Sequence, residues 1–179
     1  MNDVDVLKFW FETLSPKDWW RKNEILDAQI RDEFGTVYGE VAEGKTRNWR
    51  QTDEGRLAEI IVLDQFSRNM FRGQPGSFAY DALALDLSRA AVESGVHTRL
   101  GEEKANFLLM PYMHSESLAD HSEGLPLFEQ YCSEGTLDFE RRHASIIKRF
   151  GRYPHRNAIL GRESTPEELE FLKQAGSSF

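Results

Sequence analysis

Apolar side chains recur along most of the chain at the three- and four-residue steps of an α-helix. Leu26, Ile30, Phe34, Val37 and Val41 follow one another at steps of four, four, three and four, so they share one helical face. No segment alternates polar and apolar residues over a sustained length, and no Asn-Gly or Asp-Gly dipeptide marks a hairpin. The pattern therefore predicts an all-α fold.

Residues that cap or break helices interrupt this pattern. Ser15-Pro16 is typical of a helix entrance, and Thr165-Pro166-Glu167-Glu168 combines a capping box with a proline at the first helical position. Pro111 lies inside a predicted helix and is expected to kink or split it. Helices are expected over about residues 4–11, 26–43, 53–72, 78–94, 102–116, 125–133, 137–150 and 158–160, and after residue 165.

Short turns between the predicted helices indicate that sequence neighbours pack against one another. We therefore expect a helical-hairpin array or an irregular bundle. The chain has 179 residues, which is the size of one domain, and no linker divides it. Residues 1–179 are predicted to form a single all-helical domain.

Composition excludes several classes of protein. Apolar residues make up 40% of the chain and charged residues 29%, which is typical of a globular protein. The single cysteine, Cys132, excludes an internal disulfide and a cysteine-built zinc site. The start MNDVDVLKFWF is not a signal peptide, and no window approaches the ~18–20 apolar residues of a membrane span. We expect a cytoplasmic protein that does not bind membranes.

The net charge of −8 hides a basic segment. Residues 141–162 hold six arginines, one lysine and no acid, so this window carries +7 and the rest of the chain −15. A chain that is anionic overall is a poor candidate for binding nucleic acid. The basic segment has three explanations: pairing with acids elsewhere in the fold, a bound anion, or a solvated face. Guanidinium groups suit carboxylates and phosphates alike, so residue type does not decide.

The first candidate segment is LDQFSRNMFRG, residues 63–73. Asp64 and Arg68 lie on the helical face that carries the apolar residues, and an acid four residues before a base is a favourable helical pair. The pair either fixes helix packing in the interior or presents Arg68 to a ligand, with Asp64 orienting it. Arg72 adds a positive charge to the same segment.

The second candidate segment is MPYMHSE, residues 110–116, where the proline disrupts a helix. His114 can serve as a base, a proton donor or a metal ligand. Glu116 is only two residues away, so on a regular helix it faces elsewhere. A metal site would need His143 or His155 from another element, and we expect no metal and no cofactor.

The third candidate segment follows a predicted helix that carries His143 on its apolar face and ends at Gly151. A histidine on an apolar face is either a hydrogen-bonded core residue or a ligand. Asn157 either caps a short helix over Ala158–Leu160 or belongs to a site. Tight turns hold polar groups at fixed angles, and this turn presents Arg152, His155, Arg156 and Asn157.

These segments together resemble a known family. LDQFSRNMFRG, MPYMHSE and RHASIIKRFGRYPHRNAILGRESTPEELEFL are similar to the bacterial family catalogued as domain of unknown function 924. The resemblance covers nearly the whole chain, and it implies an all-helical, tetratricopeptide-like superhelical arrangement. It implies no activity and no catalytic residues, because the family has none assigned.

Three functions fit these features, and the basic segment favours the first. In the first, the chain binds a small anionic metabolite or a peptide carboxylate in an Arg/His-lined cleft. Alternatively, it is a hydrolase or lyase for an anionic substrate, with His114 or His155 as the acid/base, oriented by Glu116 or Asp64. The third possibility is a protein-interaction module that binds peptides in a groove. The candidate ligand-binding residues are Asp64, Arg68, Arg72, His114, Glu116, His143, Arg152, His155, Arg156 and Asn157.

Overall fold

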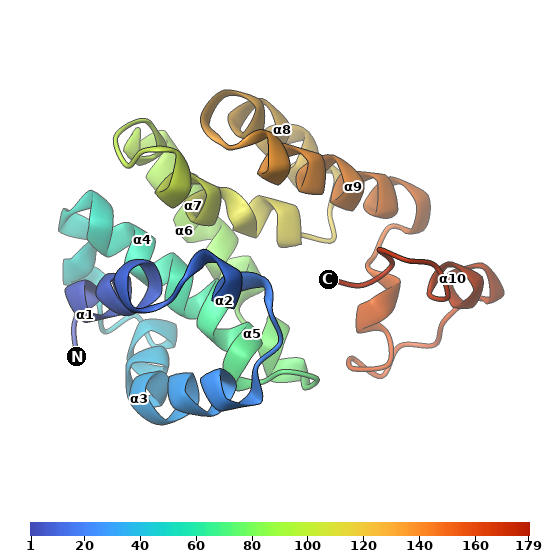
Figure 1. Cartoon of the computed structure of the whole chain (residues 1–179). Helices are drawn as coiled ribbons and strands as arrows, with labels where there is room; N and C mark the ends of the chain where they lie inside the picture. The colour runs from blue at the N-terminus through green and yellow to red at the C-terminus, as the bar shows by residue number, and fades with distance from the viewer.

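The computed structural model describes the whole chain, residues 1–179, and all its regular elements are helices (Figure 1). The all-α prediction is confirmed. The tetratricopeptide-like arrangement remains a prediction, since the helices are seen to pack as a bundle. None of the helices combines the length and the apolar character that a bilayer crossing requires.

The N-terminal helices form one side of the bundle. Helix α1 (Asp3–Lys8) continues as a π-helical turn over Phe9–Thr13, and α2 (Pro16–Trp20) follows. The Asp18 carboxylate accepts hydrogen bonds from the backbone and hydroxyl of Ser15, which fixes the start of α2 as the Ser-Pro pair predicts. Helix α3 (Glu24–Ala42) carries the apolar face identified above toward the core.

The predicted helix over residues 53–72 is present, but one turn of it is wider than an α-helix. Helix α4 (Asp53–Ile61) runs into a π-helical turn at Val62–Phe66 and then into α5 (Ser67–Met70). The Thr52 hydroxyl accepts a hydrogen bond from the Gly55 N–H at the start of α4. Single π-helical turns inside α-helices occur often at functional sites. This one contains Asp64.

In the next four helices α6 packs against α4, and each later helix packs against the one before it (Figure 1). They are α6 (Asp81–Glu93), α7 (Glu102–His114), α8 (Leu118–Tyr131) and α9 (Glu134–Phe150). Pro111 is accommodated within α7 and does not split it. Helix α9 ends at Gly151, which has a φ of 69° in the left-handed region that glycine adopts without strain.

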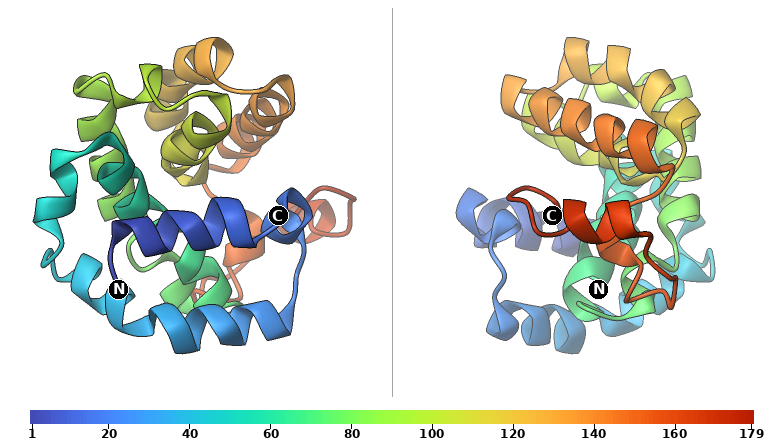
Figure 2. Two further views of the ribbon diagram at one scale, coloured as in Figure 1. Left: turned by 60° about the vertical axis from the view of Figure 1, so that its left-hand side comes forward. Right: turned by 90° about the vertical axis from the view of Figure 1, so that its right-hand side faces the viewer.

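The residues after α9 fold back below α8 and α9, orange to red in Figure 2. A short 3-10 turn at Pro154–Arg156 comes first, and α10 (Pro166–Phe171) follows, with the predicted capping box between Thr165 and Glu168. The main core holds 29 buried residues from Val6 to Phe128. The C-terminal part has only a small apolar cluster of its own, which consists of Ile146, Ile147 and Tyr153.

Three predicted boundaries are wrong. Helix α6 begins at Asp81 and not at residue 78, because Pro75 opens a separate 3-10 turn at Pro75–Phe78. Helix α8 begins seven residues before the predicted Leu125, since it continues through Gly124 and Pro126 although both residue types disfavour a helix interior. No helix forms at residues 158–160, so Asn157 caps none.

Candidate functional site

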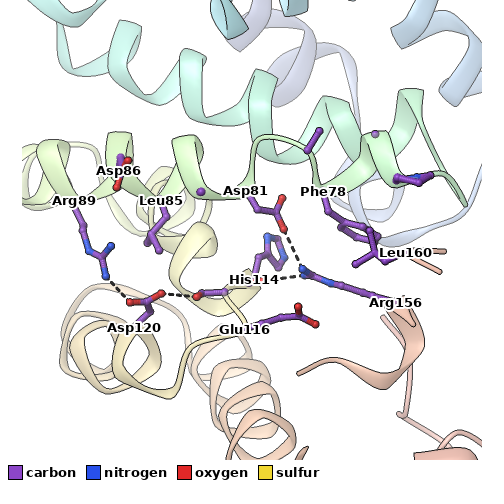
Figure 3. Close-up of a pocket in the computed structure, with 15 residues that line it drawn as sticks. Phe78, Asp81, Leu85, Asp86, Arg89, His114, Glu116, Asp120, Arg156 and Leu160 are labelled. Atoms are coloured by element: carbon purple, nitrogen blue, oxygen red, sulfur yellow. Dashed lines mark hydrogen bonds and ion pairs between the residues drawn. The ribbon is translucent and has the colours of Figure 1, made fainter. Parts of the chain in front are cut away.

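A pocket of about 750 Å³ opens where α6, the end of α7, the start of α8 and the C-terminal turn meet (Figure 3). Its wall is partly apolar, with Phe78, Leu85 and Leu160, and partly charged. The charged and ionisable lining side chains are Asp81, Asp86, Arg89, His114, Glu116, Asp120 and Arg156. A wall that combines apolar side chains with a few convergent polar groups is typical of a small-molecule site.

His114 sits at the centre of this wall and is bonded to a buried carboxylate. Its Nδ1 lies 2.7 Å from Oδ1 of Asp64, which is fully buried in the π-helical turn. Gln65 donates a hydrogen bond to the other carboxylate oxygen of Asp64. The Arg68 guanidinium lies 3.1 Å from Asp64 Oδ1 and also donates to the Asp64 backbone carbonyl. The carboxylate is therefore held from three sides and fixes the orientation of the imidazole.

The other ring nitrogen of His114 is the one available to a ligand. Nε2 has no hydrogen-bond partner in the protein, and it is not among the fully buried polar atoms that lack one. His114 lines the pocket, so Nε2 is the ring nitrogen left for a group that enters it. A carboxylate that accepts from Nδ1–H leaves Nε2 as the basic nitrogen, which is the arrangement of an acid–histidine pair in catalysis.

Electrostatics favour an ionised Asp64 and a neutral His114. Burial acts to raise the pKa of Asp64, but the charge of Arg68 and the contact with His114 together hold that pKa below its usual value. Burial lowers the pKa of His114, and the positive charge of Arg68 lowers it further, against the opposing effect of Asp64. At neutral pH the imidazole is therefore free to accept a proton at Nε2.

A second carboxylate, Asp81 at the start of α6, joins two arginines beside His114. Arg68 donates to both Asp81 oxygens, at 3.0 and 3.1 Å, and Arg156 donates to one of them at 3.1 Å. Arg156 also donates to the backbone carbonyl of His114 at 2.9 Å. Its guanidinium lies 4.4 Å from the ring centre of Phe78 and 4.7 Å from that of Tyr153. These contacts join α5, α6, α7 and the C-terminal turn around one imidazole.

The far end of the pocket is built from α6 and α8. Arg89 donates to Asp120 at 2.6 Å and to Glu123 at 2.8 Å. The hydroxyl of Ser115 donates to the other oxygen of Asp120. Figure 3 shows Arg89, Asp86 and Asp120 at this end, with Leu85 between them and His114.

Glu116 lines the pocket, but its carboxylate is fully engaged. Arg162 donates to both oxygens, at 2.6 and 2.9 Å, and the Tyr153 N–H donates to one of them at 2.7 Å. These bonds tie the C-terminal turn to the segment after α7. Glu116 therefore holds the pocket wall together and forms no hydrogen bond with the His114 ring.

The structure brings together half of the predicted site residues. His114, Glu116 and Arg156 line the pocket, and Asp64 and Arg68 bond to groups in its wall. The other five are absent from the lining and have structural contacts of their own. Arg72 pairs with Asp27 of α3, and Arg152 pairs with Glu168. Asn157 forms hydrogen bonds with Arg162 and Glu168. The Nδ1 of His143 bonds to the Phe139 carbonyl, and His155 packs against Tyr153.

The basic segment is compensated within the fold. Each of its six arginines forms an ion pair with an acid outside residues 141–162, while Lys148 forms none. The first explanation, pairing with acids elsewhere in the fold, is therefore confirmed for the arginines. Because these charges are offset, the +7 total no longer favours an anionic ligand. The partner acids are Glu129, Asp138, Glu167, Glu168, Asp81 and Glu116.

No three His, Cys, Asp or Glu side chains converge as the ligands of a metal ion would. The metal alternative required His143 or His155 beside His114. His143 instead bonds to its own helix, and its ring stacks 3.7 Å from the ring centre of Phe179.

Comparison with known proteins now places the fold. The model of a family described as "Bacterial protein of unknown function (DUF924)" matches residues 6–176. The chain belongs to the DUF924 family. The resemblance drawn from the three sequence segments is thus confirmed, and with it a family for which no activity is described.

A solved structure of another protein of unknown function shares the DUF924 chain's fold. This protein, from Agrobacterium tumefaciens, is 33% identical, with a TM-score of 0.91 over 96% of each chain. No curated protein matches the DUF924 chain. The comparisons therefore support the fold and the family, and the function has to be argued from the pocket itself.

Sequence reasoning missed the residues of α6 and α8 that complete the pocket. Asp81 is 75 residues from Arg156, and Arg89 is 31 residues from Asp120. No local motif marks such distant partners. Arg89 is the only basic residue of α6, and this isolation in an otherwise acidic and apolar helix is the one available signal.

Proposed function

We propose that this chain is an enzyme in which His114 acts as general base and acid on a small polar substrate bound in the pocket. The observation that carries the proposal is the buried Asp64 carboxylate on Nδ1 of His114, which leaves Nε2 free in a pocket wall. Groups of this kind contribute about 10²–10⁴ in rate. The reaction class is that of a hydrolase or lyase.

The nearby groups support the same chemistry. Arg156 lies at the backbone carbonyl of His114 and is fixed by Asp81, so its positive charge is in place to stabilise negative charge that develops on a substrate. Ser115 is the neighbouring hydroxyl, but its proton goes to Asp120 and not to His114. A hydrolytic reaction would therefore use water as the nucleophile, with Nε2 of His114 accepting its proton.

A binding protein without catalysis is the second candidate. It is favoured by the two arginines, Arg89 and Arg156, that line the pocket alongside its apolar wall. A peptide-binding module has weaker support, because the feature found is a pocket of limited volume bordered by ion pairs. For the enzyme and for the binding protein the proposed partner is a small molecule, for the module it is a peptide, and the proposed setting is the cytoplasm.

The proposal is tested by substrate consumption. The purified protein is incubated with a protein-free extract of bacterial small molecules, and the mixture is followed by NMR and mass spectrometry. The wild type is expected to consume at least one compound, and His114→Gln to do so about 10²–10⁴-fold more slowly.

The matched control is His97→Gln. His97 lies in the 3-10 turn at Val96–Thr98, outside the pocket, where its ring contacts Tyr131. This variant is expected to consume the same compound at the wild-type rate. Consumption by His114→Gln at the wild-type rate, or no consumption by the wild type, contradicts the enzyme proposal.

A further inference from the structure

Most charged groups in the pocket wall are satisfied by the protein, and two are not. Both oxygens of Glu116 and both oxygens of Asp120 accept hydrogen bonds from neighbouring side chains. Asp86 also lines the pocket, and its exposed carboxylate forms no ion pair and no side-chain hydrogen bond with the protein. The second group with spare capacity is Arg156, at the opposite end.

Arg156 is a buried cation with an incomplete set of acceptors. Its residue is 5% exposed, and its Nε is fully buried with no hydrogen-bond partner. The only carboxylate it contacts is Asp81, which Arg68 already binds through two hydrogen bonds. The buried Nε is out of reach of the pocket. Nη1 and Nη2 each carry two N–H donors and make one hydrogen bond apiece, so one donor on each is left for a carboxylate that enters the pocket beside His114.

The other end of the pocket has excess negative charge. Asp86, Asp120 and Glu123 lie on the facing helices α6 and α8, and Arg89 is the one cation bonded to two of them. Three carboxylates and one guanidinium leave two negative charges uncompensated within this group. Such a group attracts a cation, and Asp86 is the carboxylate with no bond to give up.

Leu85 lies between these two ends in the pocket wall (Figure 3). We propose that the substrate is an aminocarboxylic acid. Its carboxylate binds Arg156 beside His114, its ammonium group binds Asp86, and the apolar chain between them lies along Leu85. This inference rests on the proposed function, because it assumes that one substrate in the pocket contacts both Arg156 and Asp86. It deepens that function by naming the substrate class.

The test is a matched set of ligands. Binding of γ-aminobutyrate, δ-aminovalerate and ε-aminocaproate to the wild type is measured by calorimetry. Each is compared with the carboxylic acid and the primary amine of the same chain length. At least one aminocarboxylate is expected to bind about tenfold or more tightly than both of its single-charge counterparts.

Two variants test which residue binds each charged end of the ligand. Asp86→Asn is expected to weaken binding of the aminocarboxylate about tenfold and to leave binding of the matched carboxylic acid unchanged. Arg156→Gln is expected to remove the advantage of the aminocarboxylate over the amine. The matched controls are Asp138→Asn and Arg142→Gln, an exposed ion pair on α9 that does not line the pocket. Asp86 is exposed, so its variant remains informative if Arg156→Gln fails to fold.

Equal binding of the carboxylic acid or the amine, wild-type affinity in Asp86→Asn, or no binding of any aminocarboxylate at about 10 mM overturns the inference. If no aminocarboxylate binds but another compound is consumed in a His114-dependent way, the enzyme proposal stands and the substrate class is wrong. Aminocarboxylate binding that depends on Asp86, without consumption by the wild type, would retain the ligand class and remove the enzyme.

Discussion

At the scale of single residues, the site depends on how burial changes histidine chemistry. His114 keeps one nitrogen in the pocket and gives the other to Asp64. His143 and His155 are enclosed around Tyr153 instead, and neither lines the pocket. The sequence identified all three as candidates, because residue type and helical face are visible in it. It could not separate them, because their exposure depends on segments far away in the chain.

The two enclosed histidines predict an acid-sensitive fold. Burial lowers the pKa of His143 to about 3 and that of His155 to about 4, while in the unfolded chain both protonate near 6.5. Between these values the unfolded state binds more protons, so the free energy of unfolding falls as the pH drops from about 6.5 toward 4. The expected loss at about pH 5 is up to about 2 kcal/mol for each histidine.

Urea unfolding at about pH 7 and pH 5 measures this loss. His143→Gln is expected to be less stable than the wild type at neutral pH, yet to lose up to about 2 kcal/mol less on acidification. Arg142→Gln, at the exposed neighbouring position, should keep the wild-type pH dependence. The same loss in His143→Gln as in the wild type would be inconsistent with a buried neutral imidazole.

At the scale of elements, helix positions follow from the hydrophobic pattern, but several ends do not. The apolar faces of α3, α4 and α9 and the cap of α10 are where the sequence predicts them. The start of α8 was missed because Gly124 and Pro126 are locally unfavourable in a helix. Gly124 has a tertiary reason, because a Cβ built there would lie 2.9 Å from the Tyr112 Cβ on α7.

Gly124→Ala is therefore expected to destabilise the protein. Tyr112 is 1% exposed and cannot withdraw readily, so the extra methyl group forces α7 and α8 apart, at a cost of about 1–3 kcal/mol. The matched control is Gly39→Ala in α3, where nothing lies within 4 Å of the added carbon. That variant is expected to gain roughly 0.5–1 kcal/mol from helix propensity. Urea unfolding distinguishes the two, and equal stability of both variants would contradict the tight packing of α7 on α8.

At the scale of the whole molecule, the pocket is a product of the C-terminal return. The segment after α9 has little apolar core of its own, and three ion pairs connect it to the rest: Arg156 with Asp81, Arg162 with Glu116, and Glu167 with Arg149 of α9. The sequence shows a chain that is acidic overall and has one basic segment, residues 141–162, which therefore needs acidic partners. It does not indicate which acids those partners are, because the partners lie up to 75 residues away.

The central claim of the proposed function is that the fold encloses a neutral His114 whose Nε2 accepts a proton. The most direct test is the pH dependence of kcat/KM on the compound that the wild type consumes. The pKa of His114 is lowered from its ordinary value of about 6.5, so kcat/KM should stay constant as the pH falls to about 6.5. It should decline only at the lower pH where His114 becomes protonated. His114→Gln should be slower by about 10²–10⁴ and lack this acid limb. Wild-type rates in His114→Gln, or wild-type activity that rises as the pH falls below about 6.5, would contradict the account.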